Sequence, residues 1–170
     1  MRAPVLLLAA SVTATPASAD WIYDTVESAF GDEAVHIAFV DNVKTSGFVF
    51  RCKRGSDFIE VIYIVPSASL ADDAYALLNQ SMPVLRLRVD DEPIVDTDAE
   101  IFDAGGRPIV VAGTDKEMLF SIRQAKGRLA VALQLGGKNY YEQSFDTNGS
   151  RSVIDRVLSG CGLRENDPML

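Results

Sequence analysis

The sequence predicts an α+β domain built mainly from antiparallel β-sheet, either a twisted sheet or a sandwich-like arrangement, with about three packed helices and one disulfide. Short runs rich in β-branched and aromatic residues are joined by tight turns, which is typical of antiparallel strands. Three other segments carry apolar residues at helical spacing. The chain also contains two cysteines. Strands and helices interleaved in this way predict helices packed on a largely antiparallel sheet.

The first 19 residues predict a secretory signal peptide. Arg2 gives a minimal basic start, residues 5–14 are apolar, and residues 17–19 (Ala-Ser-Ala) form a small-residue cleavage site. The apolar stretch is too short for a membrane span, and no other run is apolar enough. We therefore expect cleavage after Ala19, a periplasmic location, and a single α+β domain over residues 20–170.

Export determines how the two cysteines are interpreted. In an oxidising compartment Cys52 and Cys161 can form a single bond. A redox pair would favour a C-x-x-C arrangement beside a helix start, whereas Cys161 lies at the expected C-terminus of a helix, where the dipole disfavours a thiolate. The sequence therefore predicts a structural Cys52–Cys161 disulfide.

The first half of the mature chain predicts strands followed by a helix. Residues 33–40 are apolar and rich in β-formers. Residues 48–65 predict a β-hairpin around a turn at 54–57, with Pro66 ending its second strand. A helix is expected over residues 69–80, with Ser69 as its N-cap.

The second half predicts further strands and two helices. The expected strands are residues 83–90, 94–102, 109–112, 129–135 and 140–146. The motif "TDKE" (114–117) predicts a capping box with Thr114 as N-cap, and Gly127 is the expected C′ residue of that helix. The last helix carries an apolar stripe that ends at Cys161, so this cysteine should face the core.

The strand "DTDAE" (96–100) carries the main candidate site, because Asp96, Asp98 and Glu100 share one of its faces. One interpretation is a calcium site or a carboxylate pair for glycoside hydrolysis. The alternative is a structural or binding role in which these acids meet arginines on the neighbouring strand.

Hairpin register favours the second interpretation. If Asp90 pairs with Ile94, Arg88 faces Asp96 and Arg86 faces Asp98. Opposite charges directly across a sheet are mildly stabilising. We therefore expect an ion-pair ladder of Arg86, Arg88, Asp96 and Asp98 and no metal site.

Basic residues of the first hairpin suggest one further surface. Arg51, Lys53 and Arg54, taken together with the arginines of the ladder, would form a basic strip. Such a strip either binds carboxylates of cell-wall material or is simply a solvated sheet face.

Composition and motifs argue against several classes of function. The formal charge of −8 makes nucleic acid an improbable partner and fits a basic protein partner better. His36 is the only histidine, and no G-x-S-x-G or S-x-x-K motif is present. We expect no enzyme activity, no cofactor and no zinc site.

Several short motifs together resemble a known family. They are "FVFRCKRGSDFIEVIYI" (48–64), "LRLRVDDEP" (85–93), "DTDAEIF" (96–102), "RLAVAL" (128–133) and "SFDTNGSRSVIDRVLSGCG" (144–162). With them the chain resembles the VasI-type small periplasmic proteins associated with type VI secretion gene clusters. The resemblance implies Cys52 and Cys161 as the disulfide pair, Trp21 as an N-terminal packing residue, and no catalytic residues.

Two functions are therefore expected. The first is a non-enzymatic periplasmic accessory or interaction protein, associated with type VI secretion, whose partner is another protein of the cell envelope. The alternative is an inhibitor or immunity-type binder of a lysozyme-like cell-wall hydrolase, because an acidic exported domain complements a basic enzyme. A carbohydrate-active enzyme that uses the acidic strand is the weakest of the alternatives.

Overall fold

Nine strands and three helices make up the part of the chain that the computed structural model describes, residues 20–27, 29, 33–42, 46–56, 58–66 and 72–164. The expected signal peptide and Ser69 lie outside these residues. The elements are β1 (Ile22–Val26), β2 (Val35–Asn42), β3 (Ser46–Lys53), β4 (Ile59–Ile64), α1 (Asp72–Gln80), β5 (Val84–Val89), β6 (Val95–Asp103), β7 (Pro108–Thr114), α2 (Lys116–Gln124), β8 (Arg128–Leu135), β9 (Lys138–Asp146) and α3 (Ser150–Cys161).

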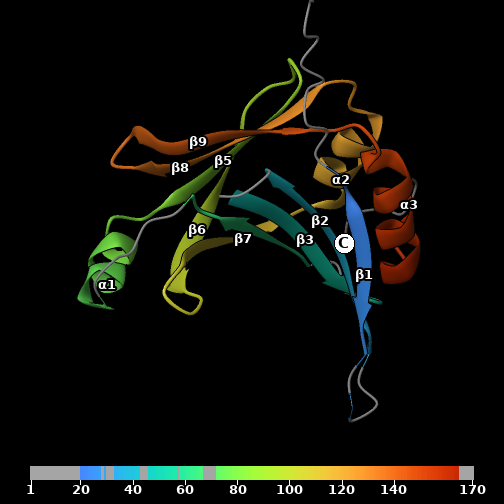
Figure 1. Ribbon diagram of the computed structural model, residues 1–170, viewed down its shortest axis with the longest axis horizontal. Coiled ribbons are helices and arrows are strands. Elements are labelled where there is room, and N and C mark those ends of the chain that lie inside the picture. The colour runs from blue at the N-terminus through green and yellow to red at the C-terminus, as the bar shows by residue number, and fades with distance from the viewer. Residues whose placement is uncertain are drawn as a thin grey trace, which may run out of the picture.

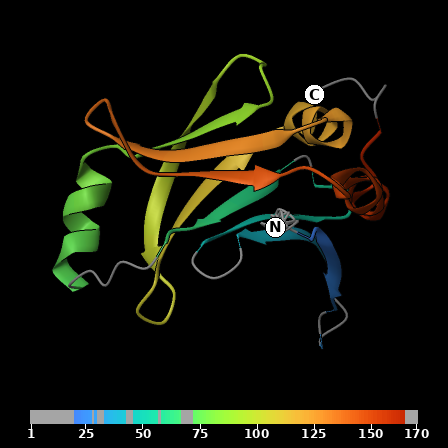
Figure 2. The ribbon, with the colours of Figure 1, turned by 45° about the horizontal axis from the view of Figure 1, so that its top comes forward.

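The strands form one curled sheet in the order β1-β2-β3-β4-β7-β6-β5-β8-β9. All neighbouring pairs are antiparallel. The sheet bends into a half-barrel, so that β8 and β9 arch over β2 and β3 (Figures 1 and 2). This confirms the expected antiparallel, strongly twisted sheet. The described strands belong to this one sheet.

The concave face of the sheet holds the core. Along β3 and β4 every second residue is buried, as the period of a strand requires. Phe145 on β9 contacts Phe48 on β3 and Tyr63 on β4, with ring centroids 5.9 and 6.5 Å apart. The last strand therefore packs across the interior against strands from the first half of the chain. Each such buried side chain contributes about 1.5–3 kcal/mol of hydrophobic stabilisation.

Side chains hold the two margins of the curl together. The Trp21 indole Nε1 donates a hydrogen bond to the Asp146 carbonyl at 2.8 Å, and Asn42 Nδ2 donates to Gln143 Oε1 at 3.0 Å. Trp21 is buried, in agreement with the packing role that the resemblance implies. The sequence did not predict β1, which follows Trp21 directly. Its two aliphatic residues, Ile22 and Val26, remain exposed.

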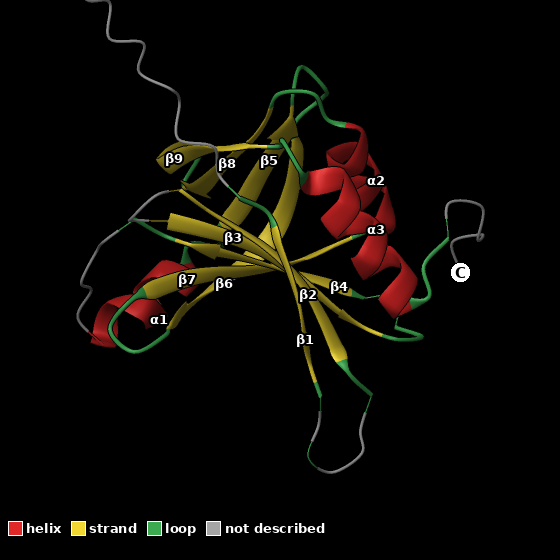
Figure 3. Cartoon of the chain, turned by 45° about the vertical axis from the view of Figure 1, so that its right-hand side comes forward, coloured by secondary structure: helices red, strands yellow, loops and turns green. Residues whose placement is uncertain are grey.

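Helices α2 and α3 lie side by side at one end of the sheet, and α1 lies at the other (Figure 3). The expected capping box is wrong by one residue: Asp115 is the N-cap of α2, and its carboxylate accepts a hydrogen bond from the Met118 amide at 3.1 Å. Thr114 cannot cap this helix because it still pairs with Ile59 in the sheet. The helix also ends before Gly127, at Gln124.

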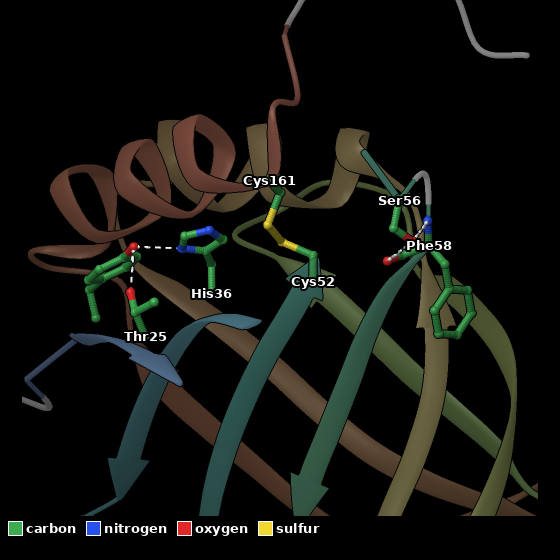
Figure 4. Close-up of a disulfide and its surroundings, with 7 residues drawn as sticks. Thr25, His36, Cys52, Ser56, Phe58 and Cys161 are labelled. Atoms are coloured by element: carbon green, nitrogen blue, oxygen red, sulfur yellow. Dashed lines mark hydrogen bonds between the residues drawn. A yellow bond between two sulfur atoms is a disulfide. The ribbon is translucent and has the colours of Figure 1, made fainter. Parts of the chain in front are cut away.

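The Cys52–Cys161 disulfide joins β3 to the last residue of α3, with its Cα atoms 6.0 Å apart and a sequence separation of 109. Both cysteines are buried, so the structure confirms the predicted staple. His36 lies beside it (Figure 4), where its Nδ1 shares a hydrogen bond of 2.8 Å with the Tyr23 hydroxyl. A Cβ at Gly160 would lie 2.4 Å from that nitrogen, so the close approach of α3 requires glycine.

Replacing Cys161 with serine should lower the free energy of unfolding by about 2–5 kcal/mol, because the unfolded chain regains the freedom of a long loop. Urea unfolding of the Cys161→Ser and Cys52→Ser variants measures this loss. Adding reductant should destabilise the wild type to a similar extent and leave the double serine variant unchanged. An unaltered midpoint in Cys161→Ser, with Cys52 titrating as a free thiol in the native wild type, would contradict the role of the bond.

Candidate functional site

The expected charge ladder forms at one position, and in a different register. Arg86 lies opposite Asp96, with Nε and Nη2 donating to the two carboxylate oxygens at 2.8 and 2.9 Å. Asp98 lies opposite Val84 instead of Arg86. The predicted pairs Arg88–Asp96 and Arg86–Asp98 are therefore wrong.

The turn after β5 explains the shift in register. Asp90 adopts a left-handed backbone conformation, with φ of 47°, and its amide donates to the Arg128 carbonyl at 2.8 Å. Asp90 thus extends the pairing of β5 with β8. The first pair between β5 and β6 is Leu87 with Val95, so the connection is wider than the predicted turn.

The Arg86–Asp96 contact keeps both side chains charged. The hydrogen bond from Arg86 lowers the pKa of the Asp96 carboxyl, and the same bond raises the pKa of Arg86. Asp98 and Glu100 are exposed, and neither has an ion pair to another described residue. On the acidic face of β6, Asp96 is therefore ion-paired, whereas Asp98 and Glu100 are not paired with another described residue.

A groove of about 520 Å³ lies over β5, β8 and β9, next to this ion pair, and borders Asn42 at the end of β2. Arg86 and Arg88 of β5 and Arg128 of β8 line it. On β5 the residues that alternate with these arginines are buried in the core, so the period of the strand directs the arginines outward. We call this feature the arginine groove.

Small residues form the floor of the arginine groove. The register places Ala132 opposite Arg86, Ala130 opposite Arg88, and Ser144 on the far side of Ala130. All three residues line the groove. Short side chains between long ones leave a depression on a sheet face that would otherwise be flat.

Two of the three arginines lack a direct acidic partner, although the charge of Arg128 acts on the Asp90 carboxylate. Arg86 is held by Asp96, but neither Arg88 nor Arg128 makes an ion pair or a side-chain hydrogen bond with another residue of the described part of the chain. Glu142 is the carboxylate that lines the groove, and its charge acts on Arg86. The lining of the groove thus carries three arginines and one carboxylate, with Asp96 and Asp90 beside it, in a chain of net charge −8.

A β-bulge shapes the β9 side of the groove. Val131 pairs with Gln143 but Leu133 pairs with Tyr140, so Tyr141 and Glu142 together lie opposite Ala132. Tyr141 has a φ of 51°, and its carbonyl accepts a hydrogen bond from Tyr63, whose phenol pKa is raised by burial. Because of the bulge, the consecutive residues Glu142 and Gln143 both line the groove.

Asp90 fixes the end of the groove where Arg128 lies. Its carboxylate accepts hydrogen bonds from the Lys126 and Arg128 amides, both at 2.8 Å. These bonds, that from Lys126 foremost, lower the pKa of the Asp90 carboxyl. A Cβ at Gly127 would lie 2.9 Å from Asp90 Oδ1, so glycine is needed where the loop wraps the carboxylate.

Other sites considered from the sequence lie elsewhere or do not form. Arg51 pairs with Glu60, and β3 is separated from β5 by three strands, so the basic strip is not continuous with Arg86 and Arg88. No three His, Cys, Asp or Glu side chains within the described ranges gather closely enough to hold a metal ion. None of the three described helices is both long and apolar enough to cross a membrane.

Sequence reasoning missed Arg128, the two alanines and the β9 residues of the groove. The available signal was the alternation in "RLAVALQL", where Arg128, Ala130 and Ala132 share the face opposite Leu129, Val131 and Leu133. That pattern shows an outward face of unusually small residues. It does not show that β8 lies next to β5.

Comparisons with known proteins find no matching family model, no matching curated protein and no matching solved structure.

Changing Asp90 to asparagine should destabilise the fold by about 1–2 kcal/mol at pH 7, because a charged acceptor of two amide hydrogen bonds is lost. The pKa of Asp90 is lowered by folding, so its contribution is full above the unfolded-state pKa and is lost as pH falls through the folded-state pKa. Urea unfolding of the wild type and of Asp90→Asn, at pH 7 and near pH 3, measures the difference in their unfolding free energies at each pH.

The neighbouring Asp91→Asn variant is the matched control, since Asp91 is exposed and its side chain makes no hydrogen bond with the described residues. It should retain wild-type stability at both pH values. A difference between wild type and Asp90→Asn that stays equally large at pH 3 would contradict the ionic role of Asp90.

Proposed function

We propose that the mature protein is a non-enzymatic accessory or interaction protein of the cell envelope that binds a partner protein through the arginine groove. The observation that carries this proposal is the pair Arg88 and Arg128, which line the groove and make no ion pair or side-chain hydrogen bond with another described residue. Guanidinium groups bind carboxylates with paired, charge-assisted hydrogen bonds.

The chemistry of the groove suits recognition. Its volume of about 520 Å³ lies within the usual range of binding sites. Besides the arginines it presents the amides of Asn42, Asn139 and Gln143 and the hydroxyl of Ser144. These groups donate and accept hydrogen bonds, and they would orient a polar ligand against the alanine floor.

The location and the kind of partner complete the proposal. A periplasmic location, with cleavage after Ala19, rests on the pattern of residues 1–19, and the buried disulfide suits an oxidising compartment. Association with type VI secretion rests on the resemblance carried by residues 48–64 and 144–162.

A second candidate is inhibition of a basic, lysozyme-like hydrolase. Exposed Asp98 and Glu100 on β6 favour it, because they have no cationic partner in the described part of the chain. A partner enzyme with a basic cleft would complement them. If this candidate is right, the protein inhibits lysozyme, and the Asp98→Asn/Glu100→Gln variant does not.

Affinity capture from a cell-envelope extract separates the two proposals. The captured partner is identified and purified, and the Kd of its complex with the protein is then measured. The Arg88→Ala/Arg128→Ala variant should bind the partner at least about tenfold more weakly, since each charged hydrogen bond is worth roughly 1.5–3 kcal/mol. The Arg54→Ala/Arg151→Ala variant removes the same charge from exposed positions outside the groove and should bind as the wild type does.

Equal binding by wild type and by the groove variant would contradict a role for the arginine groove. Lysozyme inhibition that is lost in the Asp98→Asn/Glu100→Gln variant would support the second candidate instead.

A further inference from the structure

We infer that the ligand of the arginine groove is an acidic peptide segment of the partner protein, with one carboxylate held between Arg88 and Arg128. This inference rests on the proposed function and adds the chemical identity of the ligand. Charge complementarity is its first argument, because three arginines and one carboxylate line the groove in a chain that is otherwise acidic.

The geometry of the sheet brings the two arginines to the distance that a shared anion requires. Arg88 lies directly opposite Ala130, and Arg128 is two residues from Ala130 on the same face of β8. Such diagonal neighbours have Cβ atoms about 7 Å apart, within reach of two long side chains. Like-charged guanidinium groups on such neighbours repel each other, and a carboxylate placed between them adds two attractions that offset this repulsion.

The acidic residues around the groove argue against a densely charged polyanion. Glu142 lines the groove, and Asp96 occupies the guanidinium of Arg86. The closely spaced phosphates of such a polyanion would be repelled by both carboxylates. A peptide can place single carboxylates at Arg88 and Arg128 and uncharged groups at Glu142.

Amide and apolar groups in the groove match the rest of a peptide. Asn42 donates its amide to Gln143, and the Asn42 side-chain oxygen has no donor among the described residues, so it can accept a hydrogen bond from a peptide N–H. Ile94, which is 49% exposed, adds an apolar contact at the rim. A mixture of cationic, amide and apolar groups is suited to a peptide side chain together with its backbone.

The groove residues therefore differ in role. Arg88 and Arg128 anchor the carboxylate. Arg86 already holds Asp96 through Nε and Nη2 and forms a wall. Ala130 keeps the floor low, so a leucine at this position would fill the groove without altering any charge.

The test uses a fluorescein-labelled peptide of alternating aspartate and glycine and the same peptide with asparagine in place of aspartate. Binding to the mature, disulfide-bonded protein is followed by fluorescence anisotropy at low salt. The acidic peptide should bind and be released as salt is added, because screening weakens charge pairing. The asparagine peptide should bind at least about tenfold more weakly.

Four variants assign the binding to the groove. Arg88→Ala/Arg128→Ala and Ala130→Leu should each weaken binding of the acidic peptide by about tenfold or more. Arg54→Ala/Arg151→Ala, with the same charge change, should bind as the wild type does, and Arg86→Ala should lose less than the anchor variant. Circular dichroism and the fluorescence of the buried Trp21, the only tryptophan, confirm that each variant is folded.

Three results would overturn the inference: equal binding of the two peptides, equal loss in the two double arginine variants, or binding of polygalacturonate but not of the acidic peptide. The last result would assign the groove to a carboxylated glycan. If a purified partner binds through Arg88 and Arg128 while acidic peptides do not bind, the inference fails and the proposed function stands.

Discussion

The alternation of side chains along a strand, which places an apolar face and a polar face on the same sheet, determines most of this structure. The apolar face of the nine strands is buried because the sheet curls around it, and Phe145 of the last strand then packs on Phe48 and Tyr63 from the far side of the core. The same alternation that buries Leu85 and Leu87 turns the arginines of β5 outward. The core and the arginines of the groove therefore lie on opposite faces of the same strands. The curvature of the sheet encloses the apolar face and leaves the arginine face exposed.

The curl is held at several points whose chemistry differs. At the margins, Trp21 and Gln143 make side-chain bridges between strands that share no ladder. The disulfide fixes the helical end by tying α3 to β3. Asp90 secures the junction of β5 with the loop before β8 and also positions a groove residue, Arg128. Asp90 therefore contributes both to the stability of the fold and to the shape of the groove. The disulfide, in contrast, lies on elements that do not line the arginine groove.

Much of the local structure could be predicted from the sequence, and the non-local structure could not. The β3–β4 hairpin, the apolar stripe of α3 and the Cys52–Cys161 bond follow from periodicity and from the small number of cysteines. The register of Arg86 with Asp96 was misjudged because it depends on the left-handed turn at Asp90, which β8 stabilises. Arg128 was missed for a related reason: a single sequence does not reveal that β5 lies between β6 and β8, and the groove exists only through that neighbourhood.

The most direct test is an NMR titration of the ¹⁵N-labelled mature protein with the acidic peptide. If the groove face of β5, β8 and β9 is the binding surface, the largest shifts will fall on the amides of Ala130, Ala132 and Ser144 and on the arginine side chains of the groove. Amides of the enclosed core, such as that of Phe50, will keep their positions. Shifts concentrated on β2 and β3 or on α1, with the groove resonances unmoved at saturation, would contradict the assignment of this face to binding.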